Sequence, residues 1–518
     1  MVHVYLTEAC MCVDIDIDID IYNVHLPQLS PQDSCQGSHS RLELIVIHLP
    51  SNTSSIMAAN ALANDTSTLN MVDTAYELFC TVGVMILTPA IGMFYGGTLK
   101  RKNIIQILMQ SYLVTAVISL QWFFLGYSLA VSTSSSHVMG NLSLGAIPNL
   151  GMGPYFEGGT IPSIVYFTFS AFFPIATVQI FVGAIAERSR LLPSLILGFL
   201  WTTVVYCPLA YSTWNGNGWL LNLGALDFAG GGPVHIASGI TSLTYSYFIG
   251  PRKVWKNKGA EHEPENTIIT FIGVSFIWFS WLCFNSGTLG AVNVRTGYIL
   301  TNTQLAASAA MVSFVAVDYA FTRKWSLIAA CEGAVSGLVN ITPSCGFYTP
   351  YWAVITSIFV GAVCRLCYNF NEASHIDDTT RSFVIHGIGG ILGSICLGVF
   401  ASPTIAATDG ATVIEGGWIY HHWKQMGYQF AGWVSISVWS AGATYILCFI
   451  IDKIPGCQMR ADDEIENIGT DIFEMAERDP LCFLSLDRNT NNDIEVGSSG
   501  ELKNNEEKGK LGVAVYEV

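Results

Sequence analysis

Two histidines lie inside apolar stretches of this sequence, each eight residues after an aspartate. Asp227 precedes His235, Asp378 precedes His386, and a glycine follows four residues after each histidine. Imidazole accepts and donates a proton near neutral pH, so two rings together can hydrogen-bond a small polar solute and relay a proton. A single buried histidine more often bonds a neighbouring helix, but the shared spacing favours one functional site formed by both.

The elements that must position these histidines are membrane helices. Of the 518 residues, 51% are hydrophobic and only 12% are charged, with a mean hydropathy of +0.44, whereas soluble domains carry about 25% charged residues. Runs of about 20 apolar residues therefore predict an all-α membrane protein with eleven transmembrane helices. The predicted spans are 73–96, 104–131, 161–184, 191–212, 228–250, 267–290, 297–320, 326–343, 350–369, 383–402 and 427–451.

The two aspartate–histidine stretches are copies of one pattern. They are separated by 378 − 227 = 151 residues and lie at the starts of the fifth and tenth predicted spans. Because an odd number of spans separates them, the two copies must cross the membrane in opposite directions. The sequence therefore predicts an inverted repeat of five plus five helices with one additional helix, a design that places the substrate path between the two halves.

Lysine and arginine are distributed unequally between the two sets of loops that these spans create. One set holds thirteen of them, and the other holds two, Arg295 and Lys424. Positively charged loops stay in the cytoplasm, so the sequence predicts an extracellular N-terminus and a cytoplasmic C-terminus. Three sequons fall on the predicted outer side and are candidates for glycosylation: Asn52, Asn64 and Asn141.

The terminal segments differ in composition from the apolar centre. We expect an extracellular N-terminal segment at 1–71, in which 1–56 could be an extension of the gene model, and a transmembrane domain at 72–452. A cytoplasmic region at 453–480 precedes a polar segment at 481–518 that we expect to be disordered. Much of the net charge of −16 lies in the two tails, so it indicates no nucleic-acid partner.

Six motifs, in order along residues 72–480, resemble the ammonium transporter superfamily, and most closely the high-affinity, sensor-type branch of the fungal ammonium permeases. This resemblance implies uptake of ammonium and methylammonium across the plasma membrane. It implies a homotrimer in the lipid bilayer, with no cofactor. The motifs are GMFYGGTLKRKN, FVGAIAERSR, GALDFAGGGPVH, FNSGTLGA, GLVNITPSCGF and DDTTRSFVIHGIGG.

The resemblance also assigns roles to individual residues. It implies that His235 and His386 line the pore and that Phe173 and Phe284 close the pore from outside. The external recruitment site then comprises Trp214, Thr288, Phe169 and Asp227, the last with a structural and electrostatic role. The regulatory tail, a candidate contact for cytoplasmic regulators or kinases, includes Arg460, Gly469, Asp471 and Glu474.

From these roles we expect ammonium to bind outside and lose its proton, with NH3 crossing beside the histidines and the proton crossing separately, which makes transport electrogenic. Two alternatives stay open. The protein could be an ammonium-sensing receptor whose main role is signalling. It could also be a membrane-embedded metalloenzyme, but no third histidine has the spacing of a metal ligand, so we expect neither a metal site nor an enzyme.

Overall fold

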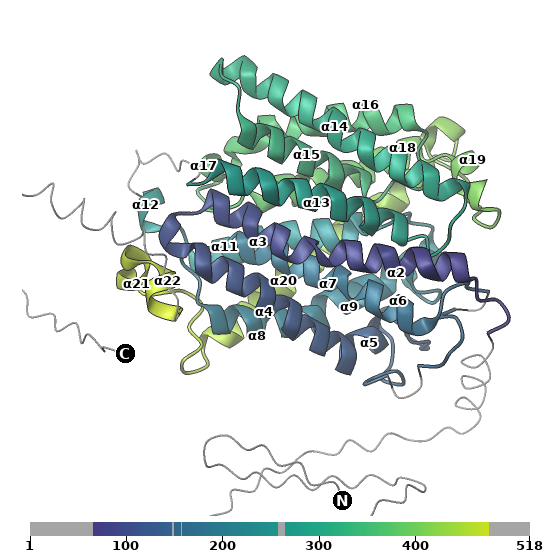
Figure 1. The fold of residues 1–518 in the computed structure, drawn as a ribbon, viewed down its shortest axis with the longest axis horizontal. Helices are drawn as coiled ribbons and strands as arrows, with labels where there is room; N and C mark the ends of the chain where they lie inside the picture. Colours follow the sequence, from purple (N-terminus) through teal and green to yellow (C-terminus); the bar gives the residue numbers. More distant parts are fainter. Residues whose placement is uncertain (1–65, 148–149, 157, 257–264, 476–518) are drawn as a thin grey trace, which may run out of the picture. The chain divides into compact units, whose positions relative to one another are not determined.

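The computed structural model describes residues 66–475, with gaps at 148–149, 157 and 257–264. Within these ranges every named element is helical, and β-pairing is limited to two isolated bridges (Figure 1). The predicted all-α class is therefore confirmed for the part of the chain that the structure describes. The sequons at Asn52 and Asn64 and the segment 481–518 lie outside the described residues.

Nine helices in the described ranges are long and apolar enough to cross a membrane, so the chain is a multi-pass membrane protein. They are Met71–Thr98, Arg101–Val131, Ser163–Gly183, Leu191–Leu223, Thr267–Gly287, Val294–Thr322, Pro350–Ser374, Phe383–Phe400 and Lys424–Asp452. A further apolar helix, α15 (Leu327–Ile341), is shorter. The predicted span at 228–250 forms a π-helical turn, η4 (Gly231–Ile236), followed by α11 (Ala237–Ile249).

Several of these long helices are divided into shorter elements. The elements other than η4, α11 and α15 are α2 (Met71–Met85), α3 (Leu87–Thr98), η1 (Arg101–Asn103), α4 (Ile104–Gln121), η2 (Trp122–Gly126), α5 (Tyr127–Val131), α6 (Ser163–Ser170), α7 (Phe172–Gly183), α8 (Leu191–Trp201), η3 (Thr202–Tyr206), α9 (Cys207–Trp214), α10 (Trp219–Leu223), α12 (Lys253–Lys256), α13 (Thr267–Gly287), α14 (Val294–Thr322), α16 (Pro350–Leu366), η5 (Cys367–Asn369), α17 (Phe370–Ser374), η6 (Phe383–Ile388), α18 (Gly389–Phe400), α19 (Pro403–Ala406), η7 (Ala407–Asp409), η8 (Trp418–Tyr420), α20 (Lys424–Asp452), α21 (Asp463–Ile468) and α22 (Thr470–Glu474).

Local sequence explains several helix starts. The Asn70 side chain caps α2 by accepting the Val72 and Asp73 N–H groups, and the Ser326 hydroxyl caps α15 by accepting the Ala329 N–H. Asn293 caps α14 by accepting the Arg295 N–H. Short polar side chains at this position satisfy N–H groups that no helical carbonyl can reach. These three helix starts are thus fixed by polar residues that precede them in the sequence.

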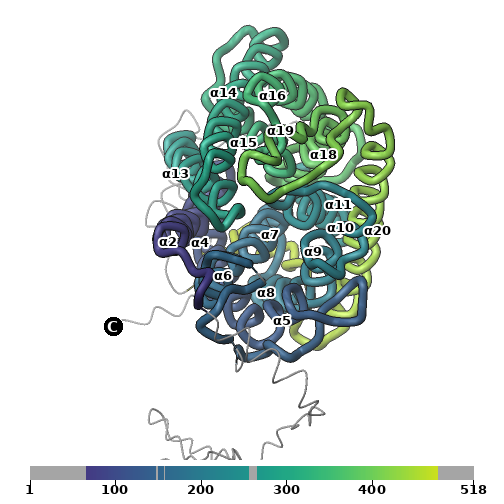
Figure 2. Tube along the Cα trace, turned by 90° about the vertical axis from the view of Figure 1, so that its right-hand side faces the viewer, coloured from purple at the N-terminus to yellow at the C-terminus, as the bar shows by residue number. Residues whose placement is uncertain are grey.

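The bundle places α7, α11 and α18 centrally and α20 at the periphery. In the segment of α6 and α7, 72% of the most apolar window is buried, against 28% in α20. Figure 2 shows α20 running along one edge of the bundle, where it contacts α8, α11 and α18. An apolar helix exposed over most of its surface fits a lipid environment, and the buried centre is where a polar site must lie.

The two ends of the bundle are named after residues that lie there, the Trp214 end and the Arg188 end. The Trp214 end contains the starts of α2 and α6. A hydrogen bond connects them there: the N–H of Asn70, just before α2, donates to the carbonyl of Thr160, just before α6, at 2.8 Å. The Arg188 end contains the loops that follow α7 and α11 and precede η6, which Arg188 connects through hydrogen bonds to Gly250 and Thr379.

Candidate functional site

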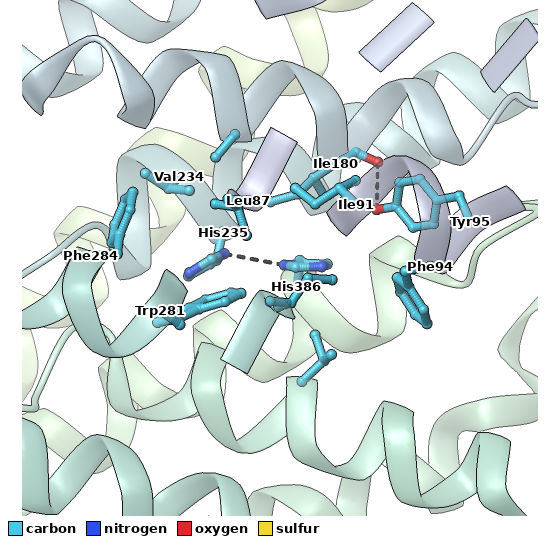
Figure 3. Close-up of a pocket in the computed structure, with 13 residues that line it drawn as sticks. Leu87, Ile91, Phe94, Tyr95, Ile180, Val234, His235, Trp281, Phe284 and His386 are labelled. Atoms are coloured by element: carbon cyan, nitrogen blue, oxygen red, sulfur yellow. Dashed lines mark hydrogen bonds between the residues drawn. The ribbon is translucent and has the colours of Figure 1, made fainter. Parts of the chain in front are cut away.

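The two predicted histidines meet in the centre of the bundle (Figure 3). The Nδ1 atoms of His235 and His386 are 3.2 Å apart, the ring centroids are 5.2 Å apart, and the residues are 2% and 5% exposed. One Nδ1 must donate and the other accept, so the two neutral rings hold opposite tautomers. Their Nε2 atoms then offer one acceptor and one donor to a solute. Trp281 stacks on His235 with centroids 5.0 Å apart.

Each histidine sits on a π-helical turn that an aspartate caps. The Asp227 carboxylate accepts the N–H groups of Gly230, Gly231 and Gly232 at 2.6–2.9 Å, at the start of η4. The Asp378 carboxylate accepts the Phe383 N–H at 2.7 Å, at the start of η6. In both copies the aspartate accepts a backbone N–H from the residue five positions later in the chain, which is Gly232 for Asp227 and Phe383 for Asp378. A carboxylate at a helix start also favours the positive end of the helix dipole.

Matching glycines allow the two histidine helices to touch. A methyl group at Gly239 would lie 2.2 Å from the Gly387 nitrogen, and one at Gly390 would lie 3.0–3.3 Å from atoms of Ile236, Gly231 and His235. Each glycine comes four residues after its own histidine and contacts the other copy. This reciprocal contact is what brings the two imidazoles within hydrogen-bond distance.

An apolar cavity surrounds the histidine pair. Its volume is about 30 Å³, which is room for about two water-sized molecules. Mostly aliphatic and aromatic side chains form the wall. In the described structure the polar groups of the lining residues are the two imidazoles, the Tyr95 hydroxyl and the Trp281 indole N–H, which donates to the Thr342 hydroxyl at 2.9 Å. Tyr95 donates to the Ile180 carbonyl at 3.3 Å. The cavity therefore offers a small solute hydrogen bonds at the histidines and little else.

Two phenylalanine rings lie between this cavity and a larger one. The centroids of Phe173 and Phe284 are 4.2 Å apart, and the larger cavity on the Trp214 side, which we call the vestibule, has a volume of about 320 Å³. Phe284 lines the small cavity and Phe173 lines the vestibule. A hydrated ion would have to displace both rings to pass.

The structure brings most of the expected recruitment residues to the vestibule. Trp214, Phe169 and Thr288 line it, and the Thr288 hydroxyl, which donates to the Phe284 carbonyl at 2.8 Å, keeps its oxygen lone pairs as acceptors. Asp227 does not line it; instead, its backbone carbonyl accepts the Trp214 indole N–H at 2.9 Å. Asp227 thus fixes Trp214 and η4 together, which agrees with the structural role expected for it.

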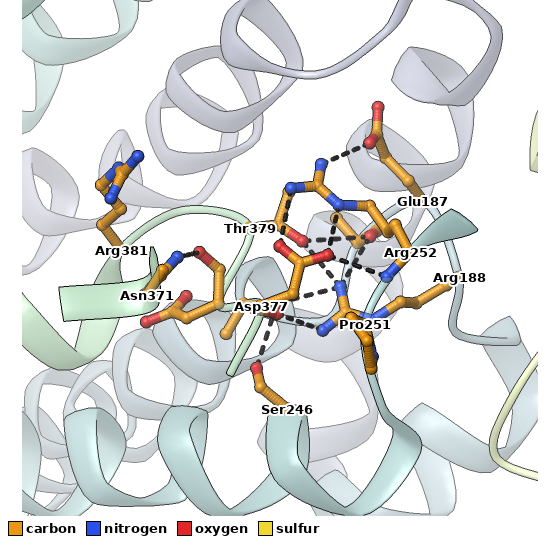
Figure 4. A network of polar contacts seen from close by, with 12 residues as sticks. Glu187, Arg188, Ser246, Pro251, Arg252, Asn371, Asp377, Thr379 and Arg381 are labelled. Atoms are coloured by element: carbon orange, nitrogen blue, oxygen red, sulfur yellow. Dashed lines mark hydrogen bonds and ion pairs between the residues drawn. The ribbon is translucent and has the colours of Figure 1, made fainter. Parts of the chain in front are cut away.

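A buried ion network closes the Arg188 end of the bundle (Figure 4). The Arg252 guanidinium pairs with Asp377 at 2.8 Å and with Glu187 at 2.6 Å, and Arg188 donates to the Asp377 carbonyl. Burial would raise the pKa of the Asp377 carboxyl, but the charges of Arg252 and Arg188 hold it below its usual range. The network joins the loops after α7 and α11 to the segment before η6.

The C-terminal segment caps two membrane helices at this same end. The Asp471 carboxylate accepts the Ile105 and Gln106 N–H groups at 2.9 and 2.8 Å, at the start of α4. The Glu474 carboxylate accepts the Leu191 N–H at 2.8 Å, at the start of α8. Both carboxylates satisfy helix-terminal N–H groups, so the tail is bound to the body of the protein by specific polar contacts.

Two further predicted tail residues complete this attachment. Arg460 donates to the Ile249 carbonyl at 2.6 Å and pairs with Glu466 at 2.7 Å. Gly469 has a φ of 113°, a conformation that favours glycine, and a methyl group there would lie 2.6 Å from the Lys102 backbone oxygen.

Other candidates lie away from the pore. Asn141 is exposed, and its side-chain amide donates to the Thr133 carbonyl at 2.8 Å. Within the described ranges, no group of three or more His, Cys, Asp or Glu side chains could hold a metal ion.

Comparison with known proteins decides the family. The model of the Ammonium Transporter Family matches residues 75–479. The chain belongs to the ammonium transporter family. Ammonium transporter 3 of Schizosaccharomyces pombe is 47% identical over 453 residues, covering 79% of this chain and 87% of that protein. Ammonium transporter MEP2 of Saccharomyces cerevisiae is 35% identical over 426 residues, covering 81% and 85%.

A solved structure in this family has a similar fold. The crystal structure of Candida albicans Mep2 superposes with a TM-score of 0.74 at 37% identity, covering 77% of this chain and 88% of that one. The resemblance to the ammonium transporter family stated from the six motifs is confirmed.

Sequence reasoning missed two parts of the site. Trp281, the ring that stacks on His235, lies three residues before Phe284 and therefore on the same face of α13; helical spacing could have identified it. The pairing of Arg252 with Asp377 joins residues 125 positions apart, and nothing in their local sequence indicates this contact.

Proposed function

We propose that the protein takes up ammonium across the plasma membrane through a pore that its twin histidines line. The observation that carries the proposal is the 3.2 Å contact of His235 and His386 inside an apolar cavity behind the Phe173–Phe284 pair. The names of two relatives, Ammonium transporter 3 of Schizosaccharomyces pombe and Ammonium transporter MEP2 of Saccharomyces cerevisiae, support the same substrate.

The geometry favours passage of NH3 and separate transfer of the proton. A bare cation entering the cavity would lose its hydration, at a cost of many kcal/mol. Among the described residues that form the wall, there is no carboxylate to compensate. Ring faces in the vestibule can hold the ion before this step. Neutral NH3 can accept a hydrogen bond from one imidazole and donate to the other. A proton that crosses through the imidazoles makes the uptake electrogenic.

We further propose eleven membrane helices, of which ten form two inverted halves. The equal five-residue spacing of the caps at Asp227 and Asp378 supports this repeat, as do the reciprocal contacts of Gly239 and Gly390. The excess of lysine and arginine in one set of loops orients the Trp214 end outward and the Arg188 end toward the cytoplasm. The N-terminus and Asn141 are then extracellular.

The docked tail is proposed to regulate transport from the cytoplasm. Asp471 and Glu474 cap α4 and α8, so a kinase or another regulator that releases the tail would free two helix starts. The same contacts give a route for signalling, by which the protein could also serve as an ammonium sensor. We propose a homotrimer, as the family resemblance implies.

Uptake of labelled methylammonium in cells that lack their own ammonium permeases tests the proposal. We expect His235→Ala and His386→Ala each to reduce uptake strongly at an unchanged amount of protein in the plasma membrane. His421→Ala, which changes a histidine in the outer loop, is the matched control. Normal uptake in both pore variants would overturn the proposed path.

A further inference from the structure

The residue three positions after each capping aspartate has a left-handed backbone. It is Gly230 in the first copy, with a φ of 111°, and Arg381 in the second, with a φ of 54°. The Gly230 carbonyl accepts the Val234 N–H at 3.1 Å. The Arg381 carbonyl accepts the Ile385 N–H at the same distance. Val234 and Ile385 directly precede the two histidines, so the left-handed residue helps to set the direction in which each histidine helix begins.

The two copies differ in how easily this conformation forms. Glycine adopts a positive φ freely, and a methyl group at Gly230 would lie 2.6 Å from the Val234 side chain. A residue with a side chain is rarely found at a positive φ, because its Cβ atom comes too close to the following carbonyl oxygen. Such a residue persists only where its surroundings hold it. Arg381 therefore needs contacts that Gly230 does not need.

One short segment supplies these contacts. The Arg381 guanidinium carbon lies 4.1 Å from the centroid of the Tyr368 ring, and the guanidinium donates to the Tyr368 carbonyl. It also pairs with the Glu372 carboxylate at 3.0 Å. Tyr368 belongs to η5 and Glu372 to α17, which follows it directly. We call Arg381, Tyr368 and Glu372 the Arg381 clamp.

The same segment is itself fixed by buried hydrogen bonds. Asn371 of α17 is buried, and its side-chain amide donates to the Asp378 carbonyl at 2.7 Å. The Tyr368 hydroxyl donates to the Glu332 carboxylate of α15 at 2.5 Å. Both ends of the turn that precedes η6, Asp378 and Arg381, are therefore held by side chains of one segment.

The first copy has a different support. The Phe228 N–H donates to the Pro343 carbonyl at 2.9 Å. The Ala229 N–H donates to the Thr342 carbonyl at 3.1 Å. Backbone hydrogen bonds thus support the turn before η4, whereas side chains support the turn before η6. The second arrangement can be changed by substitution without altering the pore wall.

We propose that Arg381 and Tyr368 are positioning residues for His386, because the clamp holds the left-handed residue from which the His386 helix starts. Among the described residues that line the two cavities, neither is present, so both act through the backbone. The clamp lies at the Arg188 end, away from the vestibule. Loosening it should therefore lower the maximal rate of uptake and leave the apparent KM unchanged. The inference rests on the proposed function, because uptake reports the position of His386.

The test is uptake of labelled methylammonium per molecule of protein in the plasma membrane of cells that lack their own permeases. Arg381→Ala removes the clamp and keeps the unfavourable φ. It should lower the maximal rate about fivefold or more, the factor that corresponds to the cost of a left-handed residue. Arg381→Gly removes both, so its maximal rate should stay within about twofold of the wild type. Tyr368→Leu should act like Arg381→Ala, but should have no further effect in the Arg381→Gly background.

Arg323→Ala is the matched control. Arg323 is also left-handed, with a φ of 58°, but it is exposed and follows the end of α14. Its maximal rate and apparent KM should equal those of the wild type.

The proposal is overturned if Arg381→Ala transports at the wild-type rate, if Arg381→Gly loses as much rate as Arg381→Ala, or if only the apparent KM changes. If Arg381→Ala does not reach the plasma membrane, Tyr368→Leu with and without Arg381→Gly decides by the same comparison. Loss of uptake in His235→Ala and His386→Ala would leave the proposed function intact in each case.

Discussion

Asp227→Asn should remove one of the hydrogen bonds that fix the start of η4. The native carboxylate accepts three N–H groups at 2.6–2.9 Å. An asparagine oxygen can still accept those of Gly230 and Gly231, but its amide nitrogen would face the Gly232 N–H, donor against donor. The loss of one bond to a charged group costs about 1.5–3 kcal/mol, and the stranded buried donor costs about 1–3 kcal/mol more. We therefore expect a penalty of about 2.5–6 kcal/mol on the turn that holds His235.

The assay is methylammonium uptake per molecule of protein at the cell surface, together with the unfolding temperature of the purified protein in detergent. A penalty of about 3 kcal/mol is a factor of about one hundred in an equilibrium constant, so uptake should fall at least about tenfold. Asp378→Asn is the matched control, because the asparagine oxygen can still accept the Phe383 N–H. Equal uptake in the wild type and both variants would refute the capping argument.

Three further outcomes are expected. Gly239→Ala should abolish most uptake, because the added methyl group meets backbone at 2.2 Å, whereas Gly442→Ala, with no atom within 4 Å, should leave uptake normal. Asp377→Asn should lower the unfolding temperature at neutral pH by an amount equivalent to about 3 kcal/mol. The folded pKa of Asp377 is depressed, so the ionised carboxylate contributes its full stabilisation above the unfolded pKa of about 3.9 and loses it as pH falls below that value. On acidification the variant should therefore lose less stability than the wild type. Asp471→Asn should release the tail, seen as faster protease cleavage after residue 453, and normal cleavage would contradict the docking role.

The sequence predicted much of the fold because a membrane helix can be recognised from its local sequence alone. Runs of apolar residues marked the long helices, and the predicted span at 228–250 was found as η4 and α11. Its division into a π-helical turn and an α-helix was not predicted. Hydropathy does not indicate where the backbone hydrogen bonds change from the π-helical to the α-helical pattern. The aspartate–histidine spacing identified the two rings that meet in the structure.

The parts of the site that the sequence did not predict depend on contacts between distant residues. Thr288 was expected in the recruitment site, but the bond that its hydroxyl donates to the Phe284 carbonyl, which fixes the direction of its oxygen lone pairs, is evident only from the structure. Glu77 resembles any acid near a helix start until the structure shows that its oxygens have no hydrogen-bond partner among the described residues. Long-range pairs such as Arg252 with Asp377 leave no trace in a single sequence.

The measurement that tests the central claim most directly is the current evoked by an ammonium pulse in liposomes that contain the purified protein. We expect a current selective for ammonium over potassium in the wild type. We expect that current to be lost in the double variant His235→Ala, His386→Ala. An ammonium-selective current of wild-type size in the double variant would show that the paired imidazoles do not form the path.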